Sequence, residues 1–124
     1  MAGTIVADTI QDGAGNSTSM DNAIYGSAKA WVNFNGVTTA TIRASYNVSS
    51  VVRNSTGNYT VNFTNTLADA NYVITSTLSN NNSANFGAFQ LVTTPTASSF
   101  NYKDVTTNTG TPQDNTYEMI ACFR

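Results

Sequence analysis

The sequence predicts an all-β protein: an antiparallel β-sandwich preceded by an extended N-terminal segment. Three observations indicate this fold. Short runs of β-branched and aromatic residues follow one another from Lys29 onward, separated by Asn, Gly, Ser and Thr. Several of these runs alternate apolar and polar residues, as a strand with one buried face requires. No stretch predicts a helix of ordinary length.

The clearest strand pair is a hairpin formed by residues 51–53 and 59–63. The loop 54–58 between them contains Gly57, which adopts positive φ without strain. The apolar residues that share one face of the second strand are Tyr59, Val61 and Phe63. We therefore expect this face to be buried in the core.

The remaining strands can be placed from the same patterns. We expect them over residues 1–10, 29–34, 38–46, 72–78, 86–94, 98–105 and 117–124, and the first strand of the hairpin extends over residues 48–53. Pro95 ends the strand before it because it has no N–H for the ladder. Residues 67–71 predict at most one helical turn. Trp31, the only tryptophan, is expected to anchor the core, and the alternative is a platform on which a ligand stacks.

The N-terminal part of the chain differs in character from the rest. Its strand candidate is followed by residues 11–22, which predict an extended or flexible polar connector, and residues 23–28 fit either an extended piece or one helical turn. Such a segment can dock on its own domain, on a neighbouring subunit or on a larger assembly, or it is a frayed terminus. We assign residues 1–28 to an anchoring strand and linker and residues 29–124 to the sandwich. The candidate anchor residues are Thr4, Ile5, Val6 and Ile10.

Composition excludes several classes of partner. The chain has 5 Lys and Arg against 7 Asp and Glu, and charged residues make up 10% of its 124 residues. Without a basic run it offers no counterion-releasing surface for nucleic acid. No apolar run approaches the roughly 20 residues that span a bilayer, and no signal peptide is visible. We therefore expect that the chain does not insert into a membrane. We also expect that it assembles in a reducing cytoplasm, where the single Cys122 is a buried apolar residue of the last strand.

Reactive side chains do not form a recognisable pattern. The chain has no histidine, so it has neither a Cys/His metal site nor an ordinary nucleophile–base pair. The seven carboxylates are scattered, and their spacing does not favour the facing pair that a glycosidase needs. The sequence thus predicts a protein that is not an enzyme and that needs no cofactor.

One loop has the composition of a sugar contact. Residues 79–85 are rich in Asn and are followed by Phe86, so this loop can offer amides to hydroxyl groups and a ring to a sugar face. The alternative is a solvated loop. The candidate ligand-binding residues are Asn80, Asn81, Asn82 and Phe86.

Several segments carry a resemblance to a known class of proteins. They are MAGTIVADTI at the start, KAWVNFNG at 29–36, IRASYNVSS at 42–50, GNYTVNF at 57–63 and ADANY at 68–72. Together they resemble small tail-fibre and other virion structural proteins of tailed bacteriophages, especially cyanophages and other marine phages. The resemblance implies an all-β module, commonly a homotrimer, whose N-terminal segment attaches to the particle while the C-terminal domain faces outward. A weaker similarity, in strand order and closing aromatic strand, is to trimeric lectin-like sandwiches, so the expected sandwich is of jelly-roll or lectin-like type.

These observations lead to an expected function. The chain would be a phage virion structural protein, a short trimeric tail fibre or appendage that contributes to host attachment. Its partners would be further copies of itself, other virion proteins and a host-surface glycan. Because the chain has no repeat or shaft region, a capsid decoration (cement) protein is the alternative. A free carbohydrate-binding module is the second alternative.

Overall fold

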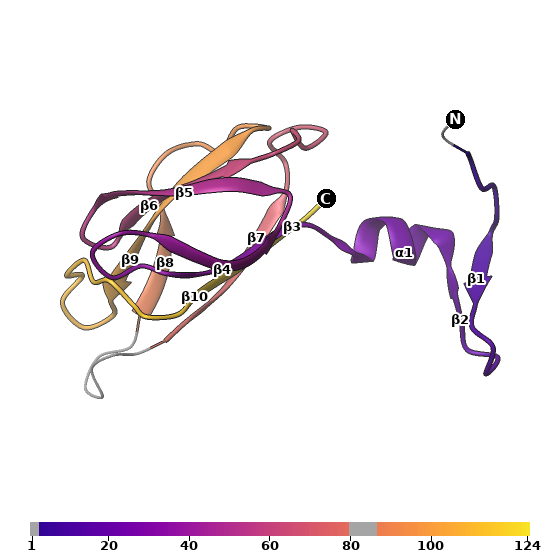
Figure 1. The fold of residues 1–124 in the computed structure, drawn as a ribbon, viewed down its shortest axis with the longest axis horizontal. Helices are drawn as coiled ribbons and strands as arrows, with labels where there is room; N and C mark the ends of the chain where they lie inside the picture. The colour runs from indigo at the N-terminus through magenta and orange to yellow at the C-terminus, as the bar shows by residue number, and fades with distance from the viewer. Residues whose placement is uncertain (1–2, 80–86) are drawn as a thin grey trace.

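The computed structural model describes residues 3–79 and 87–124. Two four-stranded antiparallel sheets pack face to face, and the N-terminal segment projects from one end of them (Figure 1). In the first sheet the strand order is β4-β3-β10-β7, and in the second it is β5-β6-β9-β8. The predicted antiparallel β-sandwich is confirmed.

The eight strands of the sandwich correspond to the eight predicted from residue 29 onward. The first sheet consists of β3 (Ala28–Asn35), β4 (Thr41–Tyr46), β7 (Val73–Leu78) and β10 (Glu118–Phe123). The second sheet consists of β5 (Val48–Ser55), β6 (Asn58–Phe63), β8 (Gly87–Leu91) and β9 (Ser99–Thr106). The largest difference is in β8, which ends several residues before Pro95.

The core lies between the two sheets and is rich in aromatic rings. The face of β6 predicted to be buried is buried, and so is Cys122. Tyr59 meets Phe34 of the opposite sheet edge to face at 5.2 Å between ring centroids, and Phe89 stacks on Tyr102 at 4.5 Å. The other buried apolar residues are Ala30, Val32, Val48, Val51, Val61, Phe63, Leu67, Tyr72, Phe100 and Ile120. Burial of this apolar surface is the main source of stability of the sandwich.

A single residue carries the chain from the first sheet to the second. Asn47 lies between β4 and β5 with φ of 54°, a left-handed conformation that asparagine tolerates better than most residues. Its Nδ2 donates to the carbonyl oxygens of Lys29 and Asn65, and its Oδ1 accepts from the N–H of Asn65 at 2.8 Å. The side chain therefore joins three segments at this corner of the sandwich.

The N-terminal segment is more ordered than its composition predicts. Instead of a strand over residues 1–10 and a polar connector, it forms a hairpin of β1 (Thr9–Gln11) and β2 (Ser17–Ser19). The turn depends on Asp12, whose carboxylate accepts the N–H groups of Ala14 and Asn16 and the side-chain amide of Asn16. These bonds, that of the Asn16 side chain first, lower the pKa of Asp12.

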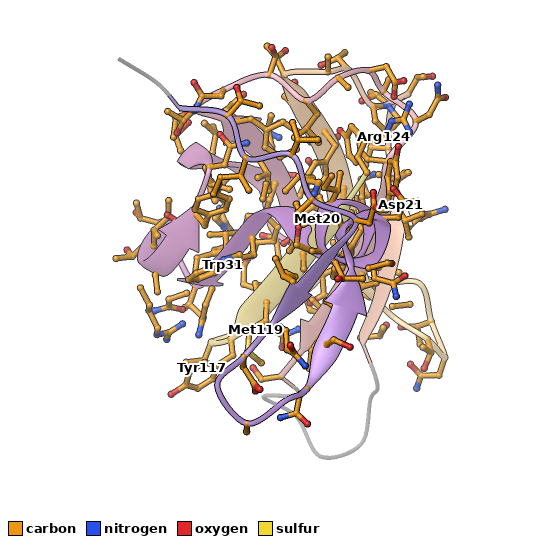
Figure 2. The ribbon with its side chains drawn as sticks, turned by 90° about the vertical axis from the view of Figure 1, so that its right-hand side faces the viewer. Met20, Asp21, Trp31, Tyr117, Met119 and Arg124 are labelled. Atoms are coloured by element: carbon orange, nitrogen blue, oxygen red, sulfur yellow. The ribbon has the colours of Figure 1, made fainter. Side chains whose placement is uncertain are left out.

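A short helix, α1 (Met20–Gly26), follows the hairpin and resolves the alternatives for residues 23–28. Ser19 caps its first turn by accepting the N–H of Asn22, and Asp21 adds a negative charge there. At the other end Lys29 donates its ammonium group to the carbonyl oxygen of Ile24. Figure 2 shows the molecule from the side of the N-terminal segment, and Met20 and Asp21 lie in front of the sandwich in this view.

The helical turn expected at residues 67–71 is absent. The Asp69 carboxylate accepts the N–H of Asn71, an Asx-turn bond that competes with helix formation. Leu67 is buried in the core, so this connection is fixed by packing instead of by helical hydrogen bonds.

Candidate functional site

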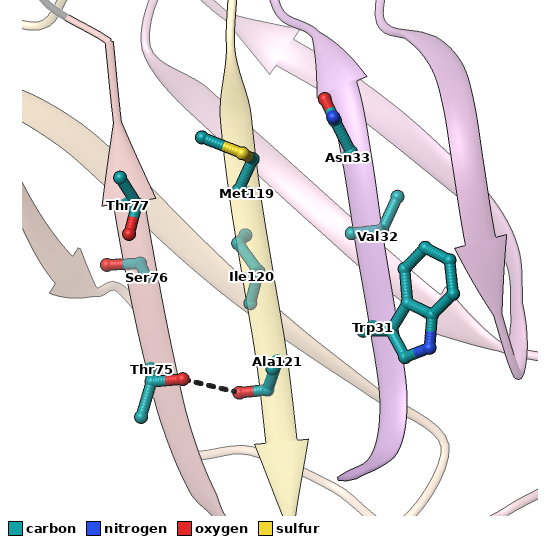
Figure 3. Close-up of a pocket in the computed structure, with 9 residues that line it drawn as sticks. All are labelled: Trp31, Val32, Asn33, Thr75, Ser76, Thr77, Met119, Ile120 and Ala121. Atoms are coloured by element: carbon teal, nitrogen blue, oxygen red, sulfur yellow. Dashed lines mark hydrogen bonds between the residues drawn. The ribbon is translucent and has the colours of Figure 1, made fainter.

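The outward face of the first sheet carries a shallow groove of about 320 Å³. We call it the Trp31 groove. Its outward-facing lining residues are Trp31, Asn33, Thr75, Thr77, Met119 and Ala121 (Figure 3). They come from β3, β10 and β7, which are neighbours in the sheet.

The position of Trp31 corrects the expectation that it anchors the core. Its side chain is 40% exposed, whereas Ala30 and Val32 beside it are buried. Because side chains alternate along a strand, burying these neighbours places the indole on the open face. This position agrees with the alternative interpretation of Trp31, a platform on which a ligand stacks.

The register of the strands explains the shape of the groove. One cross-strand row is Trp31, Ala121 and Thr75, and the next is Asn33, Met119 and Thr77. Ala121 is much smaller than the residues on either side of it. A hollow therefore remains between the indole ring and the threonines of β7.

The polar residues that line this hollow are neutral. The Oδ1 atom of Asn33 is buried and receives no hydrogen bond from any residue that the structure describes. The hydroxyl of Thr75 donates to the carbonyl oxygen of Ala121 at 3.5 Å, a long and weak bond. Within the described part of the chain, no charged side chain lines the groove.

Further aromatic residues lie on the same sheet near the groove. Tyr46 pairs with Trp31 across β4 and β3 and is 58% exposed. At the other end of the sheet Arg43 lies over the ring of Tyr117 at 4.2 Å and donates to the carbonyl oxygen of Thr116. This cation is therefore already engaged by protein groups.

The residues predicted to bind a ligand or to anchor the chain lie elsewhere. Asn80, Asn81, Asn82 and Phe86 fall outside the described residues. Of the anchor candidates, Thr4, Ile5 and Val6 are exposed in a segment without secondary structure, and Ile10 is exposed in β1. The groove itself was missed, although the alternation of Ala30, Val32 and Phe34 was a signal that could have located it.

A second hollow, of about 410 Å³, lies on the outward face of the second sheet. We call it the polar hollow; the residues that line it include Asn54, Asn58, Thr60 and Asn101. These side chains bond to one another, since Asn101 donates to the amide oxygen of Asn58 at 2.8 Å and Asn54 donates to the hydroxyl of Thr60 at 2.9 Å. Much of their hydrogen-bonding capacity is thus used internally.

Two carboxyl groups that are distant in the sequence meet inside the sandwich. Asp104 of β9 and Glu118 of β10 are both fully buried. Burial raises the pKa of each, and the charge of Asp104 raises that of Glu118 further. The hydroxyl of Tyr102 donates to Glu118 Oε2, and Asn115 donates to Asp104.

This pair is suited to holding a proton. Glu118 Oε1 receives no hydrogen bond from the residues described. A proton on this carboxyl group would turn it from an acceptor without a donor into a hydrogen-bond donor. Neither Asp104 nor Glu118 is exposed to solvent in the structure. No three His, Cys, Asp or Glu residues gather into a possible metal site within residues 3–79 and 87–124. The arrangement supports a structural role.

Asp114 fastens the loop between β9 and β10 to the hairpin of β5 and β6. Its carboxylate accepts from Arg53 at 2.6 Å, from the N–H of Gly57 at 2.8 Å and from the hydroxyl of Tyr59 at 2.6 Å. Burial alone would raise the pKa of Asp114, but these hydrogen bonds outweigh it and lower the pKa. The ionised carboxylate is therefore part of the folded structure.

Comparison with known proteins gives no relative. No protein-family model, no curated protein and no solved structure matches the chain. Over the described residues, no helix has the length and apolar character needed to cross a bilayer.

Proposed function

We propose that the chain is a non-enzymatic virion structural protein of a tailed bacteriophage, a short trimeric tail fibre or appendage that contributes to host attachment. The observation that supports this best is the separation of an uncovered N-terminal segment from a complete sandwich. From residue 3 to residue 27 no side chain is buried. Ile5 and Val6 are 84% and 93% exposed. Apolar side chains left open in this way fit a segment that docks on another surface.

The sandwich has the opposite character. It has its own core, shared by both sheets, and does not depend on the N-terminal segment for it. One part of the chain is thus suited to attachment and the other to presentation. The sequence resemblance supplies the kind of particle to which the segment attaches.

Trimerisation is part of the proposal because two of the four edge strands are weakly protected. The edge strands β7 and β8 contain no charged residue, although charges are a common device against edge-to-edge pairing. A neighbouring subunit that covers such an edge removes the need for this protection. Closed cyclic symmetry is the usual way in which identical subunits do so.

The test is incorporation into particles. Phage are grown with the full chain or with a chain that lacks residues 3–22, and the copies per particle are counted by quantitative mass spectrometry. We expect the copy number of the full chain to be a small multiple of the tail symmetry. We expect the shortened chain to be absent from the particles. Retention of the shortened chain would overturn the anchor. Copies in the hundreds would favour the capsid decoration protein instead.

A further inference from the structure

We propose that the Trp31 groove binds one ring of a neutral sugar. The inference names the ligand class of the attachment function proposed above and rests on that function for its biological setting. It places recognition on the open face of the first sheet, away from the Asn-rich loop that the sequence indicated.

The first argument is the exposed indole. A sugar ring presents polarised C–H groups on one face, and these are attracted to the negative face of an aromatic ring. Trp31 is partly exposed, and Ala121 next to it leaves the hollow in which a ring can lie. The groove volume of about 320 Å³ is at the lower end of the roughly 300–1,000 Å³ of ligand pockets, which suits a single ring.

The second argument is the set of unused hydrogen-bonding groups. The amide oxygen of Asn33 has no donor among the described residues, and a buried acceptor without a donor is unfavourable. A hydroxyl group of the ligand can supply this donor once the Asn33 side chain turns its Oδ1 toward the groove. The hydroxyl of Thr75 is held by one long bond only.

The third argument is charge. Because no described charged side chain lines the groove, an ionic ligand would lose hydration without gaining a partner. Arg43, on the edge strand of this sheet, already contacts Tyr117 and Thr116. A neutral polyhydroxyl ligand fits these conditions. The polar hollow fits them less well, since its amides bond to one another.

The experiment uses the full chain and its own reporter. Trp31 is the only tryptophan, so its fluorescence emission reports directly on the groove. The probes are glucose, galactose, mannose and N-acetylglucosamine, together with a β-linked tetrasaccharide of each. We expect a saturable change in emission for at least one probe, with the same affinity by calorimetry.

Variants separate the groove from the rest of the surface. Trp31→Ala, followed by calorimetry, should weaken binding tenfold or more, and Asn33→Ala should weaken it severalfold. The matched controls are Tyr25→Ala, an exposed aromatic residue of α1, and Asn54→Ala, an amide of the polar hollow. Both controls should bind like the wild type, and circular dichroism should show that every variant is folded.

Three results would overturn the proposal. The first is the absence of a saturable signal with every probe. The second is binding that survives Trp31→Ala or is lost in Asn54→Ala. The third is self-association of the chain that shifts the Trp31 emission to shorter wavelength. If the Trp31→Ala variant no longer self-associates, the groove would be assigned to a second copy of the chain.

The proposed function is tested separately, by counting Trp31→Ala copies in particles. Normal incorporation with weaker adsorption to the host supports both proposals. Loss of the full chain from particles would contradict the virion function and leave sugar binding in solution unaffected.

Discussion

The carboxyl groups of Asp104 and Glu118 meet in the interior of the protein although their strands belong to different sheets. Each is at an inward-facing position of its strand, so packing of the two sheets brings them together. Two buried carboxylates so close cannot both be ionised without a large cost. The pair therefore links folding to the uptake of a proton.

This pair predicts a pH dependence of stability. The pKa of Glu118 is raised in the folded chain. At a pH above 4.5, the ordinary pKa of a glutamic acid, the folded chain therefore keeps a proton that the unfolded chain releases. The free energy of unfolding should then fall as the pH rises from about 5 through the raised pKa, by at most about 1.4 kcal/mol per pH unit for one proton. Urea unfolding between pH 5 and 9 measures this slope. Glu118→Gln should flatten it, while Asp21→Asn on the exposed surface should not. Equal slopes in the wild type and Glu118→Gln would contradict the assignment.

Removing Asp114 should destabilise the protein by about 2–3 kcal/mol. Asp114→Ala deprives Arg53, the N–H of Gly57 and the hydroxyl of Tyr59 of their shared acceptor. The matched control is Arg124→Ala, which breaks the exposed ion pair with Asp69. Its effect on the free energy of unfolding should be clearly smaller, because exposed ion pairs contribute little. A loss for Arg124→Ala as large as that for Asp114→Ala would refute this ranking.

Gly57 and Gly110 separate two costs of adding a methyl group. Both have positive φ, of 63° and 66°. A Cβ at Gly57 would lie 2.5 Å from the carbonyl oxygen of Asp104, whereas at Gly110 it would meet no described atom within 4 Å. Gly110→Ala should cost about 1–2 kcal/mol from its backbone conformation alone, and Gly57→Ala should cost clearly more. Thermal unfolding of the two variants gives the difference, and similar melting temperatures would show that the structure relaxes around residue 57.

Deleting residues 3–26 should leave the sandwich nearly as stable as before. Since these residues bury no side chain, the melting temperature should change by no more than about 2 °C. Removal of residues 118–124 provides the contrast, because β10 is hydrogen-bonded to both β3 and β7 and that chain should fail to fold. A large loss of stability in the first deletion would mean that the N-terminal segment belongs to the folding unit.

Local patterns in the sequence were sufficient to predict the strands of the sandwich. The alternation of Tyr59, Val61 and Phe63 identified a buried face without further information. Trp31 was misplaced because its hydrophobicity was given more weight than its position in the alternation of the strand. Ala30 and Val32 fill the core, so the residue between them must face outward. The same oversight hid the groove.

Other features depend on contacts that a linear pattern does not contain. Asp104 and Glu118 become neighbours only when the sheets pack, so their separation in the sequence gave no signal. The hairpin of β1 and β2 depends on the bonds of Asp12 within a segment whose composition suggests a flexible linker. In both cases polar side chains determine a local structure that apolar periodicity cannot indicate.

The register of β10 against β3 pairs Phe123 with Ala28 and Glu118 with Phe34. The C-terminus and the entry from α1 are therefore at the same end of the sandwich (Figure 1). The loop between β9 and β10, with Gly110 in open space, is at the opposite end. For display of a foreign peptide, an insertion at Gly110 would point away from a surface that holds the N-terminal segment, whereas a fusion to Arg124 would face that surface.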